Sequence, residues 1–224
     1  MHRALGRPGR ADVLEEQAAG LARRTGELLW QGAFYRHRHP LDGGGLPGVD
    51  EERQLSLSNP MAINRGLARG GRARAILDEY RRRRRENGHF AEWYSIDPPF
   101  PDGLFGDDRL VGGAYVNGGI MPLVGGELAR AAFAHGREKY GLEILLQYEE
   151  MIRESGATYL WYFPDGRPST AAESTSPEAL PTDGWGSSAM LWAFVEGLCG
   201  VTDRDRNLRH VELAPRWALT DRRR

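Results

Sequence analysis

Four amphipathic segments, arranged as two closely joined pairs, constrain the fold of this chain more than any other feature. Residues 59–70 are followed by 72–86, and residues 122–135 by 137–154, with apolar side chains recurring every three or four positions. This spacing is the period of an α-helix that buries one face. Only one or two glycines separate the members of each pair. Helices joined by such short links run antiparallel, so the sequence predicts two helical hairpins.

Two further helices and two short strands are expected outside these pairs. Residues 12–31 show the same helical period, and residues 187–199 are apolar almost all round. A helix that is apolar on every side is predicted to be buried by several neighbours, in an inner layer. Residues 158–163 and 209–213 are the strand candidates. The sequence therefore predicts an all-α fold with short β segments.

Composition argues against several kinds of partner. The chain has 30 Lys and Arg against 31 Asp and Glu, a net charge of −1, which disfavours nucleic acid. Five arginines at 81–85 end a predicted helix, and we interpret them as a solvated terminus that complements the helix dipole. Cys199 is the only cysteine, so no intrachain disulfide can form. His37 and His39 have no partner at a recognised ligand spacing, so no metal or cofactor is expected.

The N-terminal residues lack the apolar core of a signal peptide, and no segment approaches the length of a membrane span. A soluble cytoplasmic protein without a membrane partner is therefore expected.

Two glycine-rich segments that contain aromatic residues each lead directly into an apolar helix. The first carries Tyr115 and Asn117, and the second carries Asp183 and Trp185. Glycines allow the backbone to bend sharply, and flat rings beside carboxylates, carboxamides and hydroxyls match the apolar faces and hydroxyl edges of sugars. These segments predict a sugar site built at helix ends.

Several motifs together resemble the C-terminal half of a six-hairpin glycosidase. The relatives suggested are catalytic domains of the amylo-1,6-glucosidase, trehalase and α-glucosidase I types. The matching stretches are residues 115–122, 159–166, 185–189 and 196–201, with a weaker match at 56–66. The resemblance implies an (α/α)6 toroid of twelve helices that binds its sugar among the loops at one end. The substrate-binding residues it implies are Tyr115, Asn117, Trp161, Tyr162 and Trp185.

Catalysis in such enzymes requires two carboxylates, one as general acid and one as base for the attacking water. The resemblance places the base at Leu160, which cannot take a proton, and places the acid in a first half for which this chain has no room. Replacement candidates are Glu92, Glu173 and Asp183. Phosphorolysis, in which phosphate attacks without a protein base, would tolerate Leu160.

The sequence thus predicts one toroid-type domain over residues 1–224, incomplete and C-terminal, with a helical core at 12–200 and a tail at 201–224 leading to a β element. Two functions stay open. One is an inverting glycoside hydrolase acting on an oligosaccharide or glucosylated metabolite, inactive as an isolated chain. The other is a non-catalytic remnant that binds glycan or another subunit. An incomplete toroid exposes apolar helix faces, such as Leu14, Leu21 and Leu28, so a homodimer or a complex with a missing N-terminal half is expected.

Overall fold

The computed structural model describes residues 2–173, 182, 184–205 and 207–220, and within them the fold is mainly α, with 47% helix and 10% strand. This confirms the predicted class. The α-helices of this part of the chain are α1 (Pro8–Leu29), α2 (Ser58–Asn64), α3 (Gly71–Asn87), α4 (Pro122–Ala134), α5 (Glu138–Ser155) and α6 (Gly184–Trp192), and α6 continues as a π-helix over Ala193–Leu198. Short 3₁₀ helices cover Ala171–Glu173 and Trp217–Thr220.

Two small antiparallel strand pairs join distant parts of the chain. β1 (Leu55–Ser56) pairs with β2 (Ile96–Asp97), and β3 (Val201–Asp203) pairs with β4 (Val211–Leu213). The strand predicted at 209–213 is therefore present in its second part. The one predicted at 158–163 is reduced to isolated bridges, in which Tyr162 pairs with Ile120 and Pro168 and Tyr159 pairs with Thr182.

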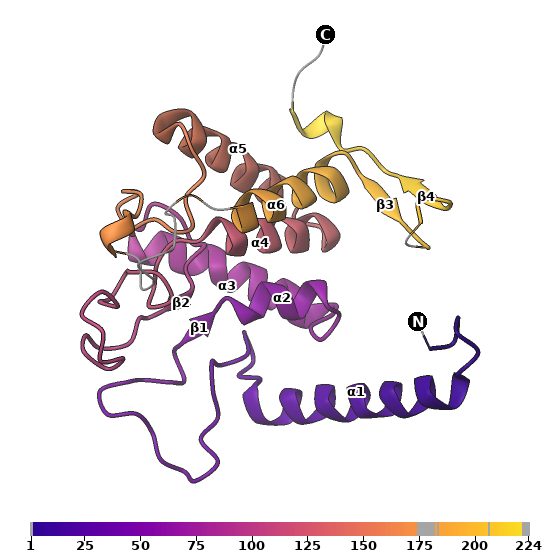
Figure 1. Ribbon diagram of the computed structural model, residues 1–224, viewed down its shortest axis with the longest axis horizontal. Coiled ribbons are helices and arrows are strands. Elements are labelled where there is room, and N and C mark those ends of the chain that lie inside the picture. Colours follow the sequence, from indigo (N-terminus) through magenta and orange to yellow (C-terminus); the bar gives the residue numbers. More distant parts are fainter. Residues whose placement is uncertain (1, 174–181, 183, 206, 221–224) are drawn as a thin grey trace.

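Helices α2 to α5 form two antiparallel hairpins, and α6 follows them. α2, α4 and α6 begin at the same end, on the left in Figure 1, and α3 and α5 return in the opposite direction. The link between α2 and α3 is longer than the predicted two glycines, because α2 ends at Asn64. Gly66 takes a left-handed φ of 77°, and the amides of Leu67 and Ala68 both bond to the carbonyl of Ala62. This turn closes the helix early.

α4 is the centre of the core and packs against α2, α3, α5 and α6. Its buried residues lie on all sides of the helix, from Pro122 to Phe133, and Leu123 is partly exposed. Gly126 lets α6 cross α4 at backbone contact, because a Cβ there would lie 2.6 Å from the carbonyl oxygen of Ala189. A Cβ at Gly125 would meet the Met190 side chain of α6 and would lie 2.7 Å from the Trp93 ring. α4 thus holds the inner position that was predicted for residues 187–199.

The helix at the C-terminal end is more exposed than predicted. Leu191 is 62% exposed, Trp192 is 50% exposed, and Phe194 and Val195 also face solvent. The prediction that residues 187–199 are buried on several sides is therefore wrong. One face packs against α4 and α5, and among the described residues nothing covers the opposite face.

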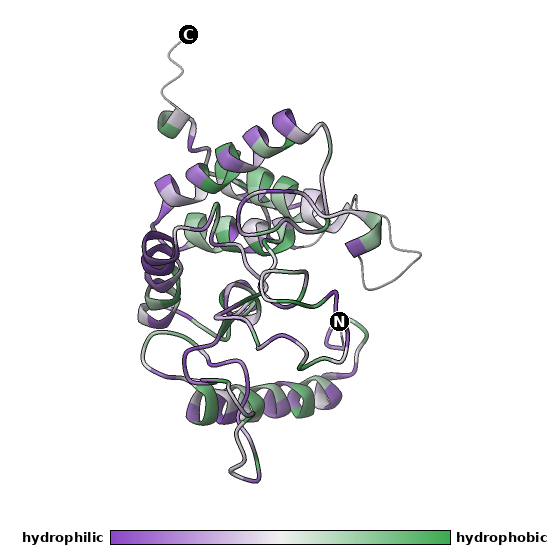
Figure 2. Cartoon of the chain, turned by 90° about the vertical axis from the view of Figure 1, so that its left-hand side faces the viewer, coloured by the Kyte–Doolittle hydropathy of each residue, from purple (hydrophilic) through white to green (hydrophobic). Residues whose placement is uncertain are grey.

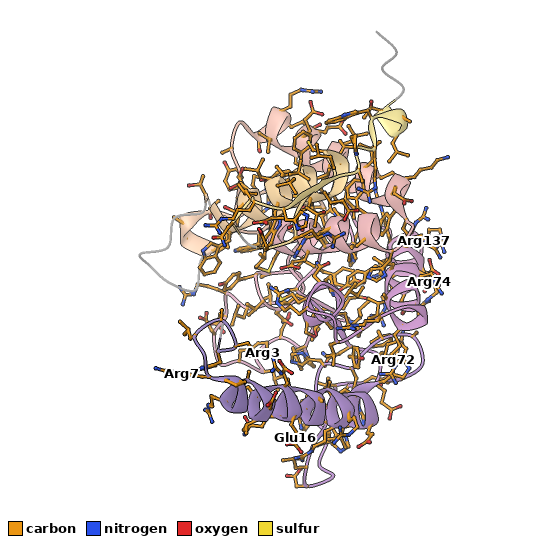
Figure 3. All side chains as sticks on the ribbon, turned by 90° about the vertical axis from the view of Figure 1, so that its right-hand side faces the viewer. Arg3, Arg7, Glu16, Arg72, Arg74 and Arg137 are labelled. Atoms are coloured by element: carbon orange, nitrogen blue, oxygen red, sulfur yellow. The ribbon has the colours of Figure 1, made fainter. Side chains whose placement is uncertain are left out.

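α1 lies along one edge of the molecule with its apolar stripe uncovered. Leu14, Leu21 and Leu28 are 37%, 67% and 37% exposed, as expected for a helix that lacks a neighbour. One contact between the α1 end of the chain and the other helices is made by Arg72, at the start of α3. Its guanidinium lies 5.0 Å from the Trp30 ring centroid, and Figure 3 shows it in the space between α1 and α3.

The arginine run in α3 is only partly a solvated helix end. Figure 2 shows α3 as a strongly hydrophilic helix at the edge of the array. Within the run, however, Arg83 is only 5% exposed and pairs with Glu79 and Asp97. Arg84 approaches the buried Glu92. The interpretation as a solvated terminus fits exposed Arg82 and Arg85 but is wrong for Arg83, because Glu79 one turn earlier and Asp97 in β2 place carboxylates against its guanidinium.

Candidate functional site

The loop before α4 makes a tight turn that brings aromatic residues to the helix mouth. The amide of Gly113 donates to the carbonyl of Asn117 (2.8 Å), and the amide of Gly119 donates to the carbonyl of Tyr115 (3.0 Å). A Cβ at Gly119 would lie 2.6 Å from the Tyr115 amide nitrogen, so only glycine fits there. Tyr115 itself has a φ of 39° and is half-buried. The predicted sharp bend is present.

Asn117 holds this loop together from inside. It is fully buried, and its Oδ1 accepts from the amide of Phe100 (2.7 Å). Its Nδ2 donates to the carbonyls of Phe100 (3.1 Å) and Leu110 (2.9 Å). The side chain therefore satisfies backbone groups of the loop and does not face the solvent.

An aromatic cluster forms beside the turn. The ring of Trp161 lies 6.5 Å from that of Tyr115 and 4.6 Å from that of Phe163, and the Arg167 guanidinium lies 3.7 Å from the Phe163 ring. Trp161 and Tyr162 are both 1% exposed, so within the cluster only half-buried Tyr115 and Phe163 and exposed Arg167 reach the surface. Phe163 and Arg167 were not predicted. The Pro-Asp-Gly turn between them is the signal that places them on the same side.

Among the predicted substrate-binding residues, Trp185 is the most exposed to solvent. It lies in the first turn of α6 and is 68% exposed. The next residue, Gly186, packs against Pro122 at the first turn of α4. The chain continues from the Tyr115 turn into α4, and Ile120 pairs with Tyr162 through two 2.8 Å backbone bonds. Trp185 and the aromatic cluster therefore belong to the same end of the helices.

The described carboxylate candidates do not form an acid–base pair at this end, because only Glu173 lies beside the cluster. Glu173 pairs with Arg167 (3.0 Å) and accepts from the amide and hydroxyl of Thr170 (both 2.9 Å), and its hydrogen bond to Arg167 lowers its pKa. Glu92 is fully buried and bonds Tyr140 in α5. Leu160 is half-buried against the core. Asp183 lies outside the described residues.

Three other findings are negative. In the described ranges no three His, Cys, Asp or Glu side chains lie close enough together to bind a metal ion. Over the same residues no helix has the length and apolar character needed to cross a membrane. The chain matches neither a protein-family model nor a curated protein sequence.

Asn117→Ala is expected to lower the free energy of unfolding by about 1–3 kcal/mol, because buried backbone groups of the loop lose their partners. Urea unfolding of the two proteins measures this. Asn117→Asp keeps the acceptor oxygen but not the amide donor, so this variant is also expected to unfold with a lower free energy than the wild type. A fully stable Asn117→Ala with weaker glycan binding would instead give this residue a ligand role.

Glu92 is expected to make stability depend on pH. Burial raises its pKa above the ordinary 4.5, against the opposing effects of Arg84 and Tyr140. The folded chain then keeps a proton that the unfolded chain releases, so the free energy of unfolding falls as pH rises from about 4.5 through the raised pKa. Glutamine does not titrate, so the stability of Glu92→Gln does not show this fall with pH.

We therefore expect Glu92→Gln to gain stability relative to the wild type between about pH 4 and about pH 7.5, measured by urea unfolding at both pH values. Glu150→Gln, at an exposed carboxylate of α5, is the control. A stability difference that is the same at both pH values would contradict the raised pKa.

Proposed function

We propose that this chain is a carbohydrate-binding domain built as an incomplete (α/α) toroid, similar to the C-terminal half of a six-hairpin glycosidase, that binds without hydrolysing. The order of helices supports the architecture, since α2, α4 and α6 run in one direction and α3 and α5 return between them (Figure 1). A cytoplasmic location and self-association through the exposed apolar faces of α1 and α6 belong to the same proposal.

The observation that carries the binding role is the exposed indole of Trp185 at the mouth of α6. Tyr115 and Phe163 reach the surface at the same end of the helices, and Arg167 adds a donor beside them. Aromatic faces stack on the apolar faces of sugar rings, and a guanidinium donates to their hydroxyls. A buried indole, such as that of Trp161, cannot stack on a sugar ring.

The carboxylates support binding rather than turnover. A glycosidase needs an acid and a base on opposite sides of the scissile bond. Here the resemblance places Leu160 at the base position, Glu173 is held by Arg167, and Glu92 lies under α5. Of the three predicted carboxylates only Asp183, which lies outside the described residues, is left as a candidate acid or base for hydrolysis.

Trp185→Ala is expected to weaken oligosaccharide binding by about 1–3 kcal/mol, the size of one aromatic contact. Calorimetric titration with maltose, isomaltose, trehalose and kojibiose measures this change. Trp217→Ala is the matched control, because Trp217 is also exposed (52%) but lies in the C-terminal 3₁₀ helix. Equal effects of the two substitutions, or no effect of Trp185→Ala, would reject the site.

A further inference from the structure

A cleft of about 610 Å³ lies between α3 and α5, and it belongs to neither the aromatic cluster nor Trp185. Its α3 wall carries Arg81, Arg84 and Arg85, which follow one another at helical spacing. Its α5 wall carries Glu143, Gln147 and Glu150, again at helical spacing on one face. A cationic wall therefore faces an acidic one, in a volume typical of small-molecule sites.

The floor of the cleft holds a fully buried carboxylate, Glu92. Its Oε1 accepts from the Tyr140 hydroxyl at 2.5 Å. Its Oε2 lies 3.4 Å from Nη1 of Arg84, close enough for charge attraction but without hydrogen-bond geometry. This oxygen is buried and accepts no hydrogen bond from any described residue. Buried acceptors left this way are rare and cost free energy.

A second acceptor in the cleft is also unused. Gln147 donates from Nε2 to the carbonyl of Phe90 at 2.7 Å, which fixes the orientation of its amide. Its Oε1 is buried and has no hydrogen-bond donor among the described residues. Two acceptors, Glu92 Oε2 and Gln147 Oε1, thus line one cleft without a donor.

Apart from Arg84, whose guanidinium lies near Glu92, the charged side chains on the two walls form no ion pair with a described residue. Arg85, Glu143 and Glu150 form no ion pair with any residue that the structure describes. Arg81 packs its guanidinium 5.1 Å from the Tyr140 ring centroid and likewise has no carboxylate partner in the described ranges. By contrast, the neighbouring Arg82 and Arg83 are both paired. Arg81 and Arg85, the two arginines of the run without a carboxylate partner among the described residues, therefore both line the cleft.

We propose that the α3–α5 cleft binds a small zwitterion of the amino-acid class. Its ammonium group donates to Glu92 Oε2 and Gln147 Oε1, and its carboxylate is held by Arg81 and Arg85. Phe90 and Leu146 supply apolar surface for a side chain. A ligand with only one of the two charges would leave either the buried acceptors or the arginines without a partner, so both charges are required for tight binding. This site is separate from the proposed glycan site.

Calorimetric titration of the full chain with L-leucine and L-phenylalanine tests the proposal. We expect saturable binding of at least one of them. The N-acetyl derivative, which lacks the ammonium, and the corresponding amine, which lacks the carboxylate, should each bind at least about tenfold more weakly, the scale of a charge-assisted hydrogen bond. Absence of binding by both amino acids, or equal binding of the one-charge analogues, overturns the proposal.

Substitutions locate the binding to the cleft. Arg85→Ala and Glu92→Gln are expected to weaken binding at least about tenfold. Arg85 is exposed, so its replacement tests the site without disturbing the core. Arg82→Ala is the control from the same run, since Arg82 pairs with Glu79 and Glu86. An equal loss of affinity in Arg82→Ala and Arg85→Ala places the ligand elsewhere and overturns the assignment.

Discussion

Arg83→Ala is expected to lower the free energy of unfolding by about 3–5 kcal/mol, the cost of removing one partner of a buried ion pair. The Arg83 side chain is 6% exposed. Its Nε lies 2.7 Å from Glu79 Oε1, its Nη1 lies 2.8 Å from Asp97 Oδ2, and its Nη2 donates to the carbonyl of Arg53 at 2.7 Å. One guanidinium therefore joins α3, β2 and the segment before β1. Without it, Asp97 is left facing a vacated cationic site.

Chemical unfolding at neutral pH measures this loss. Arg85→Ala is the matched control two positions along the same helix, exposed and without an ion pair to a described residue, and we expect a change of less than about 0.5 kcal/mol. Arg83→Lys keeps the charge but not the planar fork, so it should be intermediate. If Arg83→Ala and Arg85→Ala were equally stable, the buried network would not hold these segments together.

Gly126→Ala has the second largest expected effect, a loss of about 2–3 kcal/mol, because a methyl group on α4 would overlap the α6 backbone. The added Cβ would meet the carbonyl carbon of Ala189 and would lie 2.6 Å from both its oxygen and the Met190 nitrogen. A backbone cannot turn aside as a side chain can, so α6 must move off α4.

Gly184→Ala is the control for this prediction, because nothing lies within 4 Å of the site of its Cβ. It should change stability by less than about 0.5 kcal/mol. Thermal and urea unfolding of the two variants compare them directly. A Gly126→Ala protein as stable as Gly184→Ala would show that α4 and α6 do not cross at backbone contact.

The sequence predicted the helices best where local signals at their ends agreed with the apolar period. α3 and α5 end at Gly88 and Gly156, which both take left-handed conformations with φ of 63° and 71°. Such a glycine stops a helix whatever lies around it. The expected ends of these helices, at residues 86 and 154, are accordingly within one residue of those observed.

Exposure was harder to predict than helix content. An apolar helix surface shows that a neighbour is favourable but does not show that one is present. Trp192 was expected in the core, yet it is half exposed, with the Arg130 guanidinium 4.0 Å from its ring centroid. The better signal for the central helix was the pair of small residues in α4, Gly125 and Gly126, which permit close crossing.

The candidate site was predictable only in part, for a similar reason. Tyr115 and Trp161 come into ring contact, which follows from their place in loops at helix mouths. The position of Glu92 depends on a bond to Tyr140, 48 residues away, and on the approach of Arg84. No local pattern reveals such contacts. The sequence therefore indicated the end of the helices where aromatic residues gather, but not the burial of Glu92 between α3 and α5.

The central claim is that this chain binds glycan at the loop end without turning it over. Its most direct test is calorimetric titration of the full chain with maltose, isomaltose, trehalose and kojibiose, followed by chromatography of the same samples for free glucose and sugar phosphate, with and without phosphate. We predict saturable binding of at least one disaccharide and no released product. Steady turnover by the chain alone, or no binding of any of the four, would contradict the account.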